Sequence, residues 1–297
     1  LALCAEWRPD LIVREDMELA GAVVAERLGL PHAAVQVIMR GRPPARLAPL
    51  LEGLQELRRA LGLPPDPDGA ALHRHLLLWP CPASLRHPAA LVPPTVRAVR
   101  PVPFDRSGDE LLPTWVDALP PREERPRVYA TLGTASLTRA SQVYKTILAA
   151  VHDAPVSLVL TLGRDGNPAE YGPQPPHVRI EPYVPQTLLL PHCDAVLFHG
   201  GSGTLVAALD HGLPMVVIPF SADQPQNAEA VVGAGAGVAL ERETLTPDAL
   251  CSAVLEVLRE PRYQVRAETL RQEMHALPDP EEAAGWLEQL RRDGQVM

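Results

Sequence analysis

A glycine-rich segment with hydroxyl and imidazole side chains occupies residues 199–204. It reads His199-Gly200-Gly201-Ser202-Gly203-Thr204 and follows the apolar run 195–198. Glycines let the backbone turn tightly and approach a ligand closely. The free N–H groups at the start of a following helix, expected over 204–211, bind anions and most often phosphate. The segment therefore predicts a phosphate site with hydroxyl donors at Ser202 and Thr204 and a further contact from His199.

Two other polar segments are expected beside this one. Asp223 and Gln224 follow the predicted strand 215–219, and Tyr183-Val184-Pro185-Gln186 follows the predicted strand 178–180. Ligands of open α/β sheets bind at the carboxyl ends of the parallel strands. An Asp–Gln pair offers acceptors and donors for the hydroxyls of a sugar, and the tyrosine could stack on a base.

The standard nucleotide fingerprints are incomplete in this region. No Gly-Lys-Ser/Thr is present, and a G-x-G-x-x-G beginning at Gly201 has Val206 where the third glycine belongs. Asp223 lies 20 residues after Gly203, about the spacing of a ribose-binding acid. A nicotinamide-dependent enzyme therefore stays open as an alternative.

Alternating strands and helices must position these residues. From Arg127 onwards the pattern predicts a doubly wound α/β domain. Its predicted strands are 128–132, 156–162, 178–180, 195–198, 215–219 and 238–240, and its predicted helices are 141–152, 187–190, 204–211, 228–233, 247–259, 262–277 and 281–292. The first 38 residues predict a strand–helix–strand unit, with the helix over 17–29. Residues 40–126 are less regular: we expect helices at 47–61 and 111–119 and a linker over 105–126.

The composition is that of an ordinary globular protein. The 297 residues are 46% hydrophobic and 21% charged, with a net charge of −9, which excludes binding of a nucleic-acid backbone as the main activity. No apolar run is long enough to span a membrane. Four scattered cysteines without a C-x-x-C motif exclude a disulfide scaffold, so we expect free thiols and a cytoplasmic protein.

Segments 183–186 and 199–227 closely resemble the nucleotide-sugar signature of family 1 glycosyltransferases, in the bacterial natural-product branch that acts on macrolides and enediynes. Residues 8–13, 25–32 and 128–134 also resemble that branch, so the resemblance covers nearly the whole chain. It implies the GT-B fold, with two Rossmann-like doubly wound domains facing a cleft. Residues 1–122 would form a partial N-terminal acceptor domain with a linker. Residues 123–297 would form the nucleotide-sugar domain, with a terminal helix that packs back on the first domain through Trp286.

The resemblance also implies a role for each donor-site residue. Tyr183 and Val184 would lie at the base, Gln186 near the ribose, and Asp223 and Gln224 at the sugar hydroxyls. His199, Gly200, Gly201, Ser202, Gly203 and Thr204 would surround the diphosphate, with Thr134 as a further contact and Asn227 supporting the loop. Plant relatives carry a ribose-binding Glu where this chain has Val206, which favours a thymidine-diphosphate deoxysugar over a uridine-diphosphate sugar.

The implied reaction is an inverting displacement in which an acceptor hydroxyl attacks the anomeric carbon without a metal or cofactor. Asp66-Pro67-Asp68 resembles the D-x-D of another glycosyltransferase fold, but it lies in a proline-rich loop outside the nucleotide domain. Glu15, beside Asp16, matches the carboxylate that orients the family's basic histidine. That histidine would precede Leu1, so the chain is expected to be a fragment or a shortened protein. None of His32, His73, His75 and His87 lies in a matching context.

Several alternatives remain beside the transferase. One is an auxiliary protein that binds the nucleotide sugar without transferring it. Another is an epimerase with the same fold, for which no acid–base carboxylates can be placed. The expected partners are the nucleotide-sugar donor and an apolar acceptor, with a homodimer as a further possibility and no nucleic acid.

Overall fold

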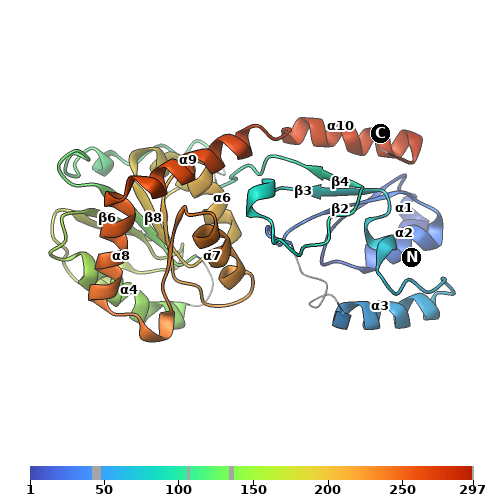
Figure 1. Ribbon diagram of the computed structural model, residues 1–297, viewed down its shortest axis with the longest axis horizontal. Helices are drawn as coiled ribbons and strands as arrows, with labels where there is room; N and C mark the ends of the chain where they lie inside the picture. The colour runs from blue at the N-terminus through green and yellow to red at the C-terminus, as the bar shows by residue number, and fades with distance from the viewer. Residues whose placement is uncertain (42–47, 106–107, 134–136, 296–297) are drawn as a thin grey trace. The chain divides into compact units, whose positions relative to one another are not determined.

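The computed structural model describes residues 1–41, 48–105, 108–133 and 137–295 (Figure 1). The chain divides into two compact units. Unit 1 comprises Leu1–Pro101 and His275–Met297, and unit 2 comprises Val102–Met274. The division lies earlier in the chain than the expected boundary at residue 122, and the last helix belongs to unit 1.

Unit 1 contains a parallel four-stranded sheet in the order β1-β2-β3-β4. The strands are β1 (Ile12–Glu15), β2 (His32–Val35), β3 (Leu76–Trp79) and β4 (Val96–Ala98). The helices are α1 (Ala2–Trp7), α2 (Ala20–Leu28), α3 (Ala48–Ala60) and α10 (Pro280–Asp293). The predicted strand–helix–strand unit is confirmed, and α2 ends at Gly29, whose φ of 69° is left-handed.

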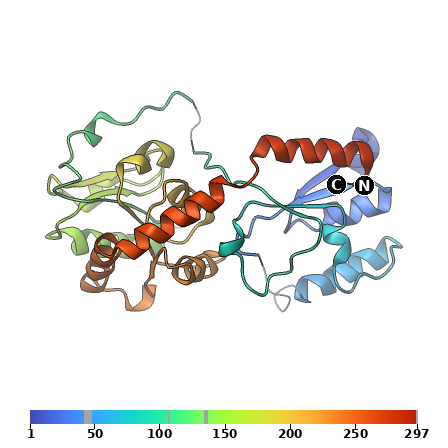
Figure 2. The same ribbon diagram turned by 45° about the horizontal axis from the view of Figure 1, so that its top comes forward.

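Helix α10 packs against the sheet of unit 1, as Figures 1 and 2 show. Its buried Ala283 and Leu290 share one apolar cluster with Ala33, Leu76, Leu78 and Val99, and Trp286 and Leu287 pack at the edge of that cluster. The chain's last helix therefore completes the core of unit 1 and covers strands that lie some 200 residues earlier in the sequence.

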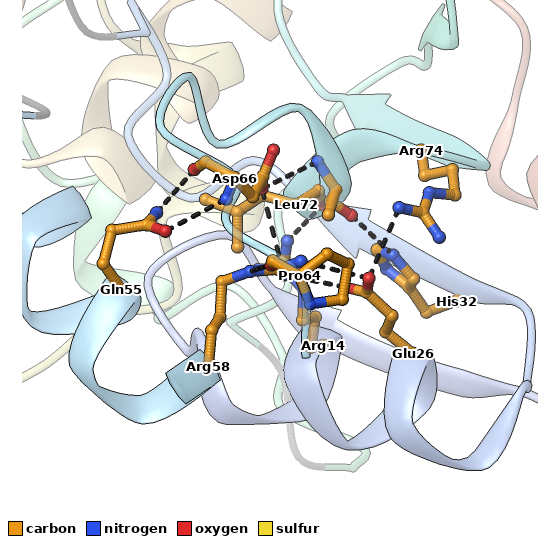
Figure 3. Close-up of polar contacts among 10 residues, drawn as sticks. Arg14, Glu26, His32, Gln55, Arg58, Pro64, Asp66, Leu72 and Arg74 are labelled. Atoms are coloured by element: carbon orange, nitrogen blue, oxygen red, sulfur yellow. Dashed lines mark hydrogen bonds and ion pairs between the residues drawn. The ribbon is translucent and has the colours of Figure 1, made fainter. Parts of the chain in front are cut away.

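A buried polar network joins α2 and α3 to the loops of unit 1 (Figure 3). Arg58 is 3% exposed and forms a two-pronged ion pair with Glu26, with nitrogen–oxygen distances of 2.7 and 3.1 Å. Asp66 accepts the N–H of Ala71 at 3.1 Å, and its own N–H donates to Gln55 at 3.0 Å. Asp66, the first residue of the D-x-D-like segment, thus stabilises the turn in which it lies.

Unit 2 contains a parallel six-stranded sheet in the order β10-β9-β8-β5-β6-β7. The strands are β5 (Arg127–Thr131), β6 (Ser157–Thr161), β7 (Val178–Glu181), β8 (Ala195–Phe198), β9 (Met215–Val217) and β10 (Gly237–Ala239). The helices are α4 (Leu137–Val151), α5 (Gln186–Leu189), α6 (Ser202–Asp210), α7 (Gln224–Gly233), α8 (Pro247–Arg259) and α9 (Pro261–His275). The predicted doubly wound α/β arrangement is confirmed.

The two faces of this sheet carry different side chains. Val128 and Ala130 of β5 join the apolar cluster that α4 and α8 complete. Because successive side chains of a strand point to opposite faces, Tyr129 and Thr131 lie on the other face. That other face is where the hydrogen bonds to α5 and α6 are made.

Residues 40–126 differ most from expectation. The expected helix 111–119 is reduced to a 3-10 turn, Thr114–Val116, which begins directly after Pro113. Strands β3 and β4 were not predicted, because their few residues lie among prolines and β3 is uniformly apolar rather than alternating. Within the described ranges, no helix is long and apolar enough to cross a membrane.

Candidate functional site

The predicted anion loop lies at the carboxyl edge of the unit 2 sheet, between β8 and α6. Gly200 has a φ of +90°, and a Cβ there would lie 2.9 Å from the backbone oxygen of Gln224. Gly201 is the N-cap of α6, which begins at Ser202. The first-turn N–H groups of a helix have no partner inside the helix. Backbone donors and the helix dipole therefore converge where the sequence predicts phosphate binding.

A hydrogen-bonded network of four residues ties the start of α7 to this loop. Asp223 Oδ2 accepts the Ser202 hydroxyl at 2.7 Å and the Asn227 amide at 3.1 Å. The same amide donates to the Gly200 carbonyl at 2.8 Å, and Asn227 is 1% exposed. The structure thus brings together four predicted residues from the turn into α6 and the start of α7, and the described residues make no hydrogen bond to Asp223 Oδ1.

Gln224 holds the turn that precedes α7. Its Oε1 accepts the N–H groups of Phe220 at 2.8 Å and Ser221 at 3.1 Å. Ala222, between them and Asp223, has a φ of +58°, an uncommon value for a residue with a side chain. The described residues make no hydrogen bond to the amide Nε2 of Gln224.

The His199 imidazole is enclosed by glycines on two sides. A Cβ at Gly133 would lie 2.8 Å from Nε2 of the ring, and a Cβ at Gly201 would lie 2.5 Å from it. The Nδ1 atom is buried and has no hydrogen-bond partner among the described residues. Burial lowers the pKa of His199, although the Thr131 backbone and the Asp223 charge oppose this effect. The ring is therefore neutral at pH 7 and has an unused polar atom.

Tyr183 contacts two residues, Arg164 and Asp105, that the sequence analysis did not identify. The guanidinium of Arg164, in the loop after β6, lies 3.8 Å from the centre of the tyrosine ring. The tyrosine hydroxyl donates to the backbone carbonyl of Asp105, whose carboxylate accepts the N–H and hydroxyl of Thr187 at 2.9 and 2.7 Å. Asp105 lies in the segment expected to be a linker, so no motif marked it.

Gln186 contacts the anion loop rather than solvent alone. Its Nε2 donates to Thr204 Oγ1 at 3.1 Å and to the Tyr129 hydroxyl at 3.3 Å. Sequence reasoning placed Gln186 and Thr204 at the site but missed Tyr129, because a tyrosine in a predicted core strand gives no signal of a polar role.

The remaining predicted residues take varied positions. Val184 is buried, Gly203 is exposed at the start of α6, and Thr134 lies outside the described residues. Glu15 is exposed at the end of β1, where its Oε2 accepts the Met17 N–H at 2.9 Å. Glu15 thus belongs to unit 1, whereas the loop cluster is formed by segments of unit 2.

His32 and His73, two of the histidines of unit 1, are wholly or partly buried. His32 is 2% exposed, and its Nε2 contacts the Ala71 carbonyl at 3.0 Å. Burial, together with the nearby Arg14 charge, lowers the pKa of His32 and of His73 to about 4. Both rings are therefore neutral and weakly basic at pH 7.

The chain is similar in sequence to proteins of bacterial antibiotic biosynthesis. Residues 1–133 match the N-terminal domain, and residues 145–290 the C-terminal domain, of the family described as erythromycin biosynthesis protein CIII-like. The chain is 34% identical to a 10-deoxymethynolide desosaminyltransferase of Streptomyces venezuelae, over 96% of this chain and 68% of that protein. It is 32% identical to a 3-alpha-mycarosylerythronolide B desosaminyl transferase of Saccharopolyspora erythraea, over 98% of this chain and 70% of that protein.

Solved structures agree with these matches. A glycotransferase of kitacinnamycin aligns with a TM-score of 0.81 at 27% identity, over 97% of this chain and 77% of that one. The spinosyn rhamnosyltransferase SpnG complexed with thymidine diphosphate aligns with a TM-score of 0.78 at 27% identity, over 97% of this chain and 75% of that one.

Proposed function

Because the chain belongs to the erythromycin biosynthesis protein CIII-like glycosyltransferases, a bacterial natural-product branch of family 1 with the GT-B fold, we propose that it transfers a deoxysugar from a thymidine-diphosphate donor to a hydroxyl of an apolar natural-product aglycone. Transferase activity follows from the family. The donor nucleotide, the type of aglycone and the inverting course are the parts we propose.

The observation that carries this proposal is the joining of the anion loop to the start of α7. The Gly200–Gly201 turn offers backbone donors to a diphosphate, and Asp223 and Gln224 offer an acceptor and a donor beside it. A site of this composition suits an anion attached to a polyol, which is what a nucleotide sugar is.

A preference for thymidine over uridine diphosphate rests on Val206. This side chain is 8% exposed on α6 and has no polar atom, so it cannot accept a hydrogen bond from a ribose hydroxyl. Two relatives are named for desosaminyl transfer, and a structural neighbour was solved with thymidine diphosphate.

The proposed reaction is a single inverting displacement. The acceptor hydroxyl attacks the anomeric carbon, and the nucleoside diphosphate leaves with its charge held by the N-terminus of α6 and by His199. Thr134 is proposed as a further diphosphate contact, and Glu15 as the carboxylate that orients the general base. The chain's described histidines in unit 1 are not assigned as that base.

Calorimetric titration with thymidine diphosphate and uridine diphosphate tests the donor assignment. We expect thymidine diphosphate to bind about 3- to 10-fold more tightly, since the thymine methyl adds apolar contact and Val206 gives ribose no advantage. Thr204→Val should weaken both ligands, whereas Thr146→Val, a matched change within α4, should weaken neither. Equal or tighter binding of uridine diphosphate would contradict the assignment.

The affinity for thymidine diphosphate is also expected to depend on pH through His199. The pKa of His199 is lowered in the free protein, so the ring is neutral at pH 7. A bound diphosphate favours the charged imidazolium and raises that pKa. Binding then takes up a proton, so affinity should fall as the pH rises from 6.5 to 8, by at most about tenfold per pH unit.

The control for this pH dependence is His199→Asn, which keeps a polar side chain but does not titrate. Because a phosphate of the ligand titrates near pH 6 (about the second pKa of a phosphate monoester), the quantity to compare is the difference between the two pH profiles. Titrations in buffers of different ionisation enthalpy should show more proton uptake in the wild type than in the variant. Identical profiles would exclude protonation of His199 when the diphosphate binds.

A further inference from the structure

A chain of side-chain hydrogen bonds crosses the interior of unit 2 behind the anion loop. It runs from Thr161 on β6 to Tyr129 on β5, then to Gln186 on α5 and Thr204 on α6. The Tyr129 hydroxyl lies 2.8 Å from Thr161 Oγ1, and the Gln186 amide reaches both Tyr129 and Thr204. Tyr129 is 1% exposed and Thr204 is 7% exposed, so these groups satisfy one another rather than water.

The direction of these hydrogen bonds determines what Thr204 can offer a ligand. The Gln186 amide nitrogen has two hydrogens, and one of them is donated to Thr204 Oγ1. The Thr204 hydroxyl therefore acts as an acceptor toward Gln186, and its own hydrogen is left for another partner. An ionised phosphate oxygen only accepts, so this hydrogen is the contact that a diphosphate at the start of α6 requires.

The opposite orientation of the Gln186 amide would remove that contact. With the carbonyl oxygen turned toward Thr204, the hydroxyl hydrogen would be donated to Gln186 and would be lost to the ligand. Thr204 alone does not select between the two orientations, because a hydroxyl can donate or accept. Tyr129, the second partner of the amide, is also a hydroxyl, but it has a further neighbour in Thr161, 2.8 Å away, to which it can give its one hydrogen.

We propose that Tyr129 is a positioning residue for the sugar donor. By donating its single hydrogen to Thr161, Tyr129 presents an acceptor oxygen that meets the N–H of Gln186 and disfavours its carbonyl. The amide so fixed directs the Thr204 hydrogen to the diphosphate. This inference rests on the proposed function and adds to it the residue that sets the direction of the hydrogen bonds between Gln186 and Thr204.

Tyr129→Phe tests the inference, because it removes only the hydroxyl. We expect thymidine diphosphate to bind this variant about 3- to 10-fold more weakly than the wild type, the effect of losing one buried hydrogen bond. The matched control is Tyr144→Phe: Tyr144 is also buried, but its hydroxyl donates to the Leu162 carbonyl at 3.4 Å and its helix, α4, packs on the other face of the sheet. The control should bind within about twofold of the wild type.

A double-mutant cycle separates positioning from general loosening of the fold. In a Thr204→Val background the hydroxyl hydrogen is absent, so Tyr129→Phe should cause no further loss of affinity. An equal loss in both backgrounds, or no loss in either, would overturn the inference. Failure of the wild-type protein itself to bind thymidine diphosphate would instead refute the proposed function. If Tyr129→Phe does not fold, Thr161→Val removes the acceptor for Tyr129 and carries the same expectations.

Discussion

Replacing Gly200 with alanine is expected to weaken thymidine diphosphate binding by about 100-fold or more. The residue has a φ of +90°, which costs an L-residue about 1–2 kcal/mol. The added Cβ would also lie 2.9 Å from the backbone oxygen of Gln224 and 3.2 Å from its Cα. Because backbone cannot give way as a side chain can, the start of α7 must move, and the contacts of Asp223 and Asn227 with the loop are lost.

The matched control for this change is Gly172→Ala in the same unit. Gly172 also has a positive φ, +67°, but no atom lies within 4 Å of the position its Cβ would take. Gly172→Ala therefore shares the backbone strain of Gly200→Ala but not its steric clash with a neighbouring segment. Calorimetry with thymidine diphosphate should separate the two variants, and thermal melting should show that both are folded. If Gly200→Ala bound within about twofold of the wild type, this loop would not be the diphosphate site.

Replacing Glu26 with alanine is expected to lower the free energy of unfolding by about 3–5 kcal/mol, the usual cost of breaking a buried ion pair. The change leaves Arg58, 3% exposed, without the carboxylate that accepts from Nη1 at 2.7 Å and Nη2 at 3.1 Å. Hydrogen bonds from Arg58 lower the pKa of Glu26. The stabilisation is therefore present above the ordinary carboxyl pKa and is lost as the pH falls through the lowered one.

Urea unfolding followed by tryptophan fluorescence measures this effect, since Trp7, Trp79 and Trp286 all lie in unit 1. Glu243→Ala is the control: it breaks an exposed ion pair with Arg242 and should leave the free energy of unfolding nearly unchanged. The double variant Glu26→Leu/Arg58→Met should recover much of the loss, because it leaves no buried charge. A Glu26→Ala cost no larger than that of Glu243→Ala would show that Arg58 finds another partner.

The regular elements of unit 2 were predictable because their signals are local. Strand 195–198 and helix 247–259 match β8 and α8 residue for residue, since each is an apolar run or a 3.6-residue pattern bounded by turn residues. Helix α7 begins four residues earlier than predicted, at Gln224, because Pro225 was read as part of a loop although proline suits the first turn of a helix.

Elements that depend on partners far away in the chain were harder to predict from the sequence. Strand β3 is uniformly apolar because it is an inner strand of a parallel sheet, and a run of four such residues does not distinguish strand from helix. The segment 105–126 was read as a linker from its prolines, yet Asp105 holds Thr187 and Tyr183 through contacts 78–82 residues along the chain.

The sequence by itself determined the doubly wound class of unit 2, the glycine-rich turn at 199–204 and the polar residues that lie beside it, because glycine spacing and the carboxyl-edge rule act over a few residues. Only the tertiary structure decided which atoms those residues have left for a ligand. Asp223 gives one oxygen to Ser202 and Asn227, and Gln186 gives its hydrogens to Thr204 and Tyr129. Hydrogen-bond partners depend on distances between strands far apart in the chain, and no local pattern records those distances.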